Sequence, residues 1–363
     1  MQFQAASPIN EAAQTEPRRY LTLETSRFVA AFFVVCGHLA NFIPIVAHHP
    51  VPRAFNLPQI ISVLFFFVLS GFVIETAHGR DAGNPKRILR YGWRRFCRLF
   101  PLYWLSLLVP LYFLLRVSSP GYLLQILTLS PFSSPHLPEL NPPAWSLRFE
   151  LVYYLMFGLL LVRRLRRPLL WSWAGLILLH WLMQIFDLFH LLPLLPFAAN
   201  LNGTAMRFLG VHSFLFLSGM AAARLRTSCR WRAASLWWLL GAAAMVMALL
   251  LPAQNWGYGY PPGWLEPFTG LLMGAMIFAV TGLEDRLRLR LPGWTAWLGA
   301  MSYPLYLMHA SIILIVGVQI TLLHHHCPPP VSLFGLMLGA VLILATAAML
   351  IDRQIQRSCR KWV

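Results

Sequence analysis

The chain has 363 residues, of which 58% are hydrophobic and only 11% are charged, and its mean hydropathy is +0.61. A soluble protein of this length needs more charge on its surface. The composition therefore excludes an ordinary soluble domain and indicates a polytopic membrane protein. The formal net charge of +17 at pH 7 would suit a nucleic-acid partner, but the placement of the cations along the chain argues against one.

Ten segments are predicted to cross the membrane. A helical span needs about 20 mainly apolar residues, because the hydrocarbon layer is about 30 Å thick and a helix rises about 1.5 Å per residue. Uninterrupted apolar runs favour helices over barrel strands, in which apolar and polar residues alternate. We therefore expect an all-α fold with spans at residues 26–47, 57–76, 99–118, 146–163, 168–190, 206–223, 233–252, 266–283, 296–322 and 332–352.

The basic residues predict the orientation of these spans. Most of the 29 Lys and Arg residues gather between alternate spans, in residues 18–19, 80–98, 163–167, 224–232, 286–290 and 353–361. By the positive-inside rule these segments are cytoplasmic, so both termini are expected in the cytoplasm, with an even number of spans. Much of the basicity then reflects topology, and we expect no nucleic-acid partner.

The domain organisation is predicted to be simple. Residues 1–20 form a polar cytoplasmic tail without the apolar core of a signal peptide, residues 21–355 a single transmembrane domain, and residues 356–363 a second cytoplasmic tail. No internal repeat is visible, which disfavours transporter folds built by duplication.

Three loop segments leave alternatives open. The apolar run Tyr122 to Leu129 is too short to cross and fits an interfacial or a re-entrant helix. The loop 253–265, rich in Gly, Pro, Trp and Tyr, fits an aromatic belt or a stacking surface for a sugar or lipid headgroup. The run "HHHC" at 324–327 lacks the ligand spacing of a metal site, so no metal is expected.

Ionisable residues inside predicted spans are the first functional signal. His38 lies 11 residues beyond Arg27, about 16 Å along a helix and near the midplane. His309 is near the middle of the ninth span, and Glu150 is about one turn into the fourth. A lone histidine on an apolar helix is usually a satisfied core residue, whereas two at similar depth with a carboxylate nearby indicate a functional cavity. A neutral imidazole can act there as a general base.

A basic stripe precedes the third span. Arg87, Arg90, Arg94 and Arg98 recur at helical steps, with Arg95 beside them. Guanidinium groups match phosphate oxygens, so the stripe fits a site for a phosphorylated donor. It fits equally well the plain anchoring of a cytoplasmic edge to anionic lipid.

The stretch "NPPAWSLRFELVYYL", residues 141–155, begins the fourth span. Trp145 suits the membrane interface and Ser146 suits a helix cap. Ser146 and Glu150 are one helical step apart, so they share a face. A cap explains Ser146 but leaves Glu150, which enters the apolar layer, unexplained.

Together these stretches resemble membrane acyltransferase family three, which includes O-acetyltransferases of lipopolysaccharide, exopolysaccharide and nodulation factors. The resemblance rests on "LTLETSRFVAAFFVVCGHL" (21–39), "LFFFVLSGFVI" (64–74), "RRFCRLFPLYWL" (94–105), "NPPAWSLRFELVYYL" (141–155) and "MSYPLYLMHASI" (301–312), in family order. There are departures: Glu24 replaces the opening aspartate, Leu64 replaces another aspartate, and Asp352-Arg353-Gln354 stands where the family has Glu-Arg-Pro.

The resemblance implies an enzyme that moves an acyl group, usually acetyl, from cytoplasmic acetyl-CoA to a hydroxyl of an extracytoplasmic carbohydrate. The expected partners are the acyl-CoA donor, a polysaccharide or glycolipid acceptor and membrane lipid. A bacterial cytoplasmic membrane is the expected location, and no metal cofactor is implied. A transporter or flippase for a glycolipid or anionic solute is the alternative, and use of acyl-CoA separates the two.

The resemblance also implies roles for single residues. His38 is the expected base or a transient acyl carrier, Glu150 orients it or the acceptor hydroxyl, and Glu24 pairs with Arg27 at the inner entrance. The donor phosphates are assigned to Arg95 and Arg98, assisted by Arg27 and Arg94. The expected substrate-binding residues are Trp145, Ser146, Tyr303, Tyr306, His309 and, more weakly, Ser70, because a Ser-Gly pair in a span often serves only tight helix packing.

Overall fold

The computed structural model describes residues 20–47, 51–52, 59–114, 119–132, 140–188, 203–228, 241, 265–288, 292–323 and 329–361. Within these residues all regular secondary structure is helical, which confirms the predicted fold class. Seven helical segments among the described residues are long and apolar enough to cross a membrane, so the chain is a polytopic membrane protein. Nearly all of the predicted span 233–252 and of the loop 253–265 lies outside the described residues, as does the run 324–327.

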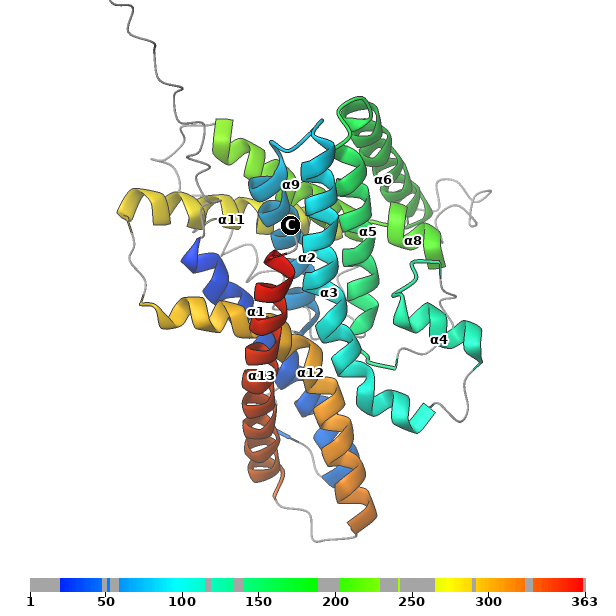
Figure 1. Ribbon diagram of the computed structural model, residues 1–363, viewed down its shortest axis with the longest axis vertical. Coiled ribbons are helices and arrows are strands. Elements are labelled where there is room, and N and C mark those ends of the chain that lie inside the picture. Colours follow the sequence, from blue (N-terminus) through cyan, green and yellow to red (C-terminus); the bar gives the residue numbers. More distant parts are fainter. Residues whose placement is uncertain are drawn as a thin grey trace, which may run out of the picture.

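The helices follow one another in a single bundle (Figure 1). Their bounds are α1 Leu21–Ala47, α2 Gln59–His78, α3 Pro85–Leu114, α4 Pro120–Leu127, α5 Ala144–Leu160, α6 Arg166–Leu188, α8 Gly203–Leu209, α9 His212–Ser228, α11 Glu266–Leu287, α12 Trp294–Leu323 and α13 Pro330–Arg360.

Three sequence predictions change in detail. The segment Gly203–Thr227 is long and apolar enough for one span, which confirms the predicted span 206–223, but its helix is interrupted by a turn at Gly210 between α8 and α9. The third span begins at Pro85, so the basic stripe and the apolar segment form one continuous helix. Ser146 is not a cap: α5 begins at Ala144, its N-cap is Pro143, and Ser146 lies in the first turn.

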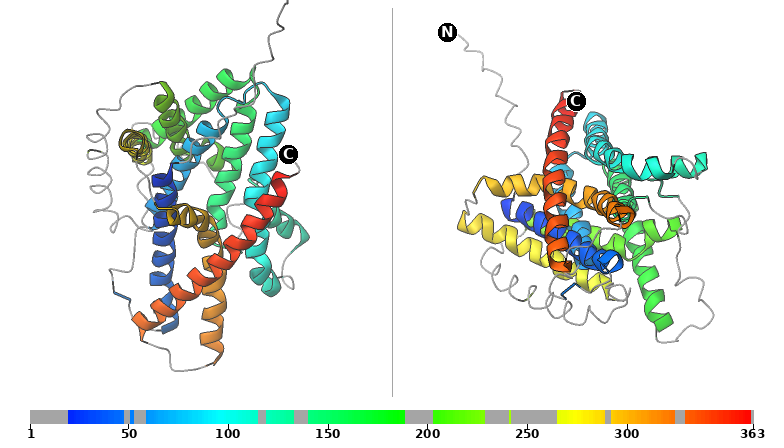
Figure 2. Two further views of the ribbon diagram at one scale, coloured as in Figure 1. Left: turned by 60° about the vertical axis from the view of Figure 1, so that its left-hand side comes forward. Right: turned by 90° about the horizontal axis from the view of Figure 1, so that it is seen from below.

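The core is built around α1 and α2. Helix α1 lies between α11 and α12, and both Figure 1 and the view from below in Figure 2 show this order. Helix α12 changes direction along its length (Figure 1), as expected where Pro304 removes a backbone hydrogen bond. Helices α1 and α12 form one main contact of the core, and α2 and α9 form the other, in which the two backbones approach very closely.

Two glycines allow that close contact. A Cβ atom on Gly219 of α9 would lie 1.8 Å from the backbone oxygen of Val68, and one on Gly71 of α2 would lie 2.0 Å from the oxygen of Phe216. Small residues let helix backbones approach in this way, and dispersion then holds the pair together in lipid. The tight-packing role expected of the Ser-Gly pair therefore falls to Gly71.

Buried carboxylates fix one end of the bundle. Glu284 of α11 accepts hydrogen bonds from the first backbone N–H groups of α1, at 2.9 Å from Leu21 and 3.1 Å from Thr22. Glu75 of α2 pairs with Arg224 of α9 at 2.8 Å and Arg166 of α6 at 3.3 Å. These contacts satisfy helix-end and charged groups that lipid cannot solvate.

The α2–α9 contact generates a stability prediction. Gly219→Ala forces the helices apart, so we expect the melting temperature in detergent to fall by at least about 5 °C. Gly175→Ala in α6 is the matched control, because nothing lies within 4 Å of its added Cβ. Equal melting temperatures for the two variants would contradict the packing described here.

Candidate active site

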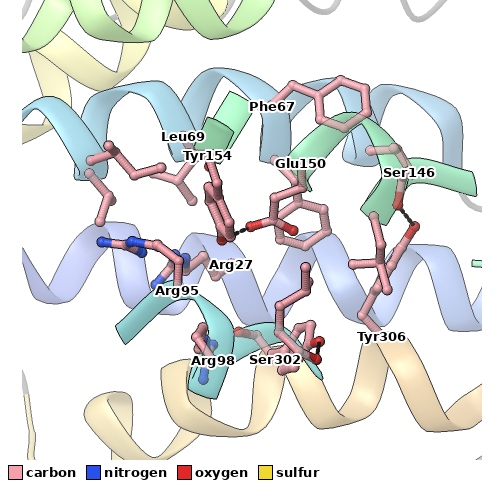
Figure 3. Close-up of a pocket in the computed structure, with 18 residues that line it drawn as sticks. Arg27, Phe67, Leu69, Arg95, Arg98, Ser146, Glu150, Tyr154, Ser302 and Tyr306 are labelled. Carbon is pink, nitrogen blue, oxygen red and sulfur yellow. Dashed lines mark hydrogen bonds between the residues drawn. The ribbon is translucent and has the colours of Figure 1, made fainter. Parts of the chain in front are cut away.

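A cavity lies at the junction of α1, α2, α3, α5 and α12 (Figure 3). It holds about 840 Å³ of space that protein atoms do not fill, counted together with its open mouth. Arginines line one end, Glu150 lies in the middle, and Ser146 and Tyr306 lie at the other end. Five helices far apart in sequence thus place polar side chains around one space.

The cationic end is formed by Arg27 of α1 and by Arg95 and Arg98 of α3. The Arg95 guanidinium carbon lies 5.5 Å from the ring centre of Tyr91 and 5.4 Å from that of Tyr154. Arg94 is exposed and does not line the cavity, so the structure separates it from this group. Three guanidinium groups in one partly enclosed space form a site for an anion.

Arg98 is held in place from two sides. Its guanidinium lies 3.2 Å from the carboxylate of Asp352 on α13 and 4.7 Å from the ring centre of Tyr303. Asp352 is 3% exposed, and the Tyr303 hydroxyl donates to the backbone oxygen of Leu99 at 2.8 Å. Arg98 therefore has a fixed position, whereas a flexible surface arginine would lose side-chain entropy on binding.

Glu150 lies in the middle of the cavity and accepts a hydrogen bond from the hydroxyl of Tyr154, one turn further along α5 (Figure 3). Arg27 is within electrostatic range of Glu150 and of Glu24. Glu24 itself does not line the cavity, because its side chain packs against α12 at Gly299. Of the two predicted carboxylates, only Glu150 is placed to touch a molecule in this space.

Ser146 and Tyr306 close the end of the cavity opposite the arginines. Their hydroxyl oxygens are 2.7 Å apart, and the Ser146 hydroxyl donates to the backbone oxygen of Pro143 at 3.0 Å. Ser70 also lines the cavity, but Trp145 does not. The Trp145 ring lies behind the lining residue Phe67, with ring centres 6.3 Å apart, and is 6.5 Å from the ring of His212.

The two intramembrane histidines contact each other directly. Nδ1 of His38 lies 2.8 Å from Nε2 of His309, and the rings are nearly parallel, with an interplanar angle of 18°. Nδ1 of His309 lies 3.2 Å from the backbone oxygen of Leu305. His309 is fully buried and His38 is partly exposed.

This chain of contacts defines the tautomers of a neutral pair. A carbonyl oxygen only accepts hydrogen bonds, so Nδ1 of His309 carries the hydrogen and its Nε2 is an acceptor. Nδ1 of His38 must then donate to His309. The lone pair of His38 is left on Nε2, as a general base or nucleophile requires.

The histidine pair lies beyond the Ser146 end of the cavity. Eleven residues are close to three helical turns, so Arg27 and His38 share one face of α1 about 16 Å apart, and likewise Ser302 and His309 share a face of α12. Neither histidine lines the cavity as it stands. The Tyr306 ring lies between, 6.1 Å from the ring of His309.

Some of these residues carried no separate signal in the sequence. Tyr154 could have been found, because it lies four residues after Glu150 on the same face. The hydrogen bond between His212 and Glu266, at 2.7 Å and buried behind Phe67, joins residues 54 apart and had no local signature. Asp352 falls within the family motif, but the resemblance implies no role for it.

The comparisons with known proteins identify the family of the chain. A family model for an acyltransferase domain matches residues 20–350, so the chain belongs to the acyltransferase 3 family of membrane proteins. No solved structure matches the chain.

Two relatives stand out among the curated proteins. The "Exopolysaccharide production protein ExoZ" of Rhizobium meliloti (strain 1021) is 26% identical over 318 residues, 81% of this chain and 89% of that protein. "Protein 2 in picA locus" of Rhizobium radiobacter is 32% identical over 167 residues, 39% of this chain and 81% of that protein. The chain is therefore similar to a protein of exopolysaccharide production over most of its length.

Proposed function

We propose that the protein is an O-acyltransferase that moves an acetyl or other short acyl group from cytoplasmic acyl-CoA to a hydroxyl of an extracytoplasmic carbohydrate. The observation that carries the proposal is the alignment of three arginines, one carboxylate and a histidine pair along neighbouring faces of α1, α3, α5 and α12. Family membership supports acyl transfer, and similarity to ExoZ supports a polysaccharide or glycolipid acceptor.

The arrangement in the membrane is part of the proposal. Both termini and the arginine end of the cavity would face the cytoplasm, which the basic segments between alternate spans support. Residues 21–355 would act as one domain, with short tails on either side, and the family match supports this division. A bacterial cytoplasmic membrane is the proposed location, as the relatives from Rhizobium support.

The donor would bind at the cationic end. Arg27, Arg95 and Arg98 would hold the phosphate groups of the acyl-CoA, with Arg98 oriented by Asp352. The thioester arm would then extend along the cavity toward Tyr306. Because the contact between Ser146 and Tyr306 ends the cavity, these two side chains must separate before a thioester can reach His38.

The chemical step follows from the tautomers. Nε2 of His38 takes the proton of the acceptor hydroxyl while the hydroxyl oxygen attacks the thioester carbonyl carbon. The new ester C–O bond forms, the C–S bond breaks, and the proton passes from His38 to the departing thiolate. His309 stabilises the charge that develops on His38, and Glu150 orients the acceptor hydroxyl. In the alternative route, through a transient acyl-histidine, the same nitrogen is the nucleophile.

The direct test is thiol release by purified protein supplied with acetyl-CoA and a cell-surface glycan, together with mass analysis of surface glycans from a deletion strain. We expect acceptor-dependent release of free CoA and the loss of acetyl groups from one glycan. Transport of a glycolipid without consumption of acetyl-CoA would instead assign the protein to the transporter class.

The first site prediction concerns the histidine pair. His38→Ala is expected to lower kcat for thiol release by at least about 100-fold, because the base is removed. His309→Asn should keep partial activity, because the amide oxygen of asparagine can accept the hydrogen bond from Nδ1 of His38. His309→Phe offers no acceptor and should lose most of the activity. His180→Gln in α6 is the control for histidine replacement, and wild-type turnover by His38→Ala would refute the assignment.

The donor site can be tested with two neighbouring arginines. Arg98→Gln should raise the KM for acetyl-CoA by about 10-fold or more, because a charge-assisted contact with phosphate is lost. Arg94→Gln makes the same charge change four residues earlier on α3, outside the cavity, and should leave KM within about twofold. Equal changes in KM for the two variants would indicate that the basic stripe only anchors the helix to anionic lipid.

Glu150 provides the third prediction. Glu150→Gln keeps the shape of the side chain but removes its charge, so we expect a folded protein with kcat reduced by about 100-fold and a nearly unchanged donor KM. Tyr154→Phe removes only the supporting hydroxyl and should have a smaller effect. A normal kcat for Glu150→Gln would leave this carboxylate with a structural role.

A further inference from the structure

A second depression, which we call the lateral groove, lies on another side of α1 from the cavity. It is open to the surroundings and is formed by α1, α2, α11 and the beginning of α12. Its space free of protein atoms is about 1230 Å³, counted with its open side. Figure 1 and the view from below in Figure 2 both place α1 between α11 and α12, and residues of all three helices line the groove.

The groove follows α1 inward from the helix end. Thr22, Ser26, Val29 and Phe33 recur at helical steps and line it along one face. Eleven residues cover about 16 Å, close to half of the hydrocarbon layer and so to one lipid leaflet. The groove begins at the end of α1 that Glu284 caps, which is its shallow end. This end lies on the same side of the protein as the arginine end of the cavity.

The lining is suited to hydrocarbon. Its apolar lining includes Val29, Phe33, Phe65, Met273 and Met276, and methionine side chains adapt to irregular apolar shapes. The hydroxyls at the shallow end are already bonded to their own helix: Thr25 donates to the Leu21 oxygen at 3.1 Å and Ser26 to the Thr22 oxygen at 2.8 Å. These two hydroxyls do not depend on a polar ligand.

Cations gather at the mouth of the groove. Arg286 and Arg288, at the end of α11, are exposed and precede the lining residue Pro292 by only a few positions. The nearby acidic groups are engaged elsewhere, because Glu284 caps α1 and Asp285 pairs with Arg226 at 2.5 Å. Trp294, which is 59% exposed, lines the groove at the start of α12 and suits the headgroup level.

We propose that the lateral groove binds one acyl chain of an anionic glycerophospholipid from this leaflet, with the lipid phosphate held by Arg286 and Arg288. A hydrocarbon chain matches the lining, and a phosphate matches the exposed guanidinium groups. The bound lipid bridges α1 to α11 and α12. It thereby supports the helix that carries Arg27 and His38, without taking part in the proposed acyl transfer.

The test is photo-crosslinking of the purified full-length protein with a photoactivatable phosphatidylglycerol or phosphatidylcholine, followed by peptide mapping and native mass spectrometry. We expect phosphatidylglycerol to label residues of α1 and α11 at least about fivefold more than phosphatidylcholine, because each arginine near the surface favours an anionic headgroup by about that factor. The crosslinked lipid should be found on single copies of the protein chain.

Two variants locate the headgroup and the chain. Arg286→Gln with Arg288→Gln should abolish the preference for phosphatidylglycerol, whereas Arg163→Gln with Arg164→Gln, an equal charge change before α6, should leave it intact. Val29→Trp, which fills the groove, should reduce labelling by both lipids. Equal labelling by the two lipids, an unchanged preference in the α11 double variant, or crosslinks to a second copy of the chain would overturn the proposal.

Discussion

The hydrogen bond between His38 and His309 is the interaction on which the rest of the site depends. Burial of an imidazole in the apolar layer costs free energy unless its polar atoms form hydrogen bonds. The pair supplies them in sequence, from His38 to His309 and from His309 to the backbone oxygen of Leu305. Each contact fixes the direction of the next, so a network of two side chains and one carbonyl presents a single lone pair.

Helix geometry explains why the arginines and the histidines belong together. Arg27 and His38 are 11 residues apart on α1, and Ser302 and His309 are seven apart on α12, so each pair repeats on one helical face. The cavity follows these faces from the arginine end to Tyr306. Helices α1 and α12, which pack closely at Gly299, thus set the spacing between the anion site and the base, and Glu284 of α11 caps the end of α1.

The fold class and much of the site could be predicted from the sequence. Hydropathy predicts the helices, because the bilayer sets their length, and residue counts along each helix predict how deep His38, His309 and Glu150 lie. The periodic stripe on α3 was less informative. Periodicity defines faces but not which face points inward, and packing of Tyr91 and Cys97 turns Arg95 and Arg98, and not Arg94, toward the cavity.

The contacts between distant segments could not be predicted. The two histidines are separated by 271 residues, and the partners of Arg98 and of Ser146 lie 254 and 160 residues away. No local pattern specifies such pairs. Their positions depend on how α1 and α5 cross α12 and how α3 crosses α13, and small residues and proline bends control such crossings. The end of the cavity at Tyr306 is likewise a property of the packed helices alone.

A structure with a non-hydrolysable acyl-CoA bound, determined by cryo-electron microscopy, tests the central claim most directly. The account predicts phosphate density at Arg95 and Arg98 and separated side chains of Ser146 and Tyr306. The acyl carbonyl should lie close to Nε2 of His38, with room between them for the acceptor hydroxyl. Phosphates bound away from these arginines, or an acyl group that ends where no path leads to His38, would contradict it.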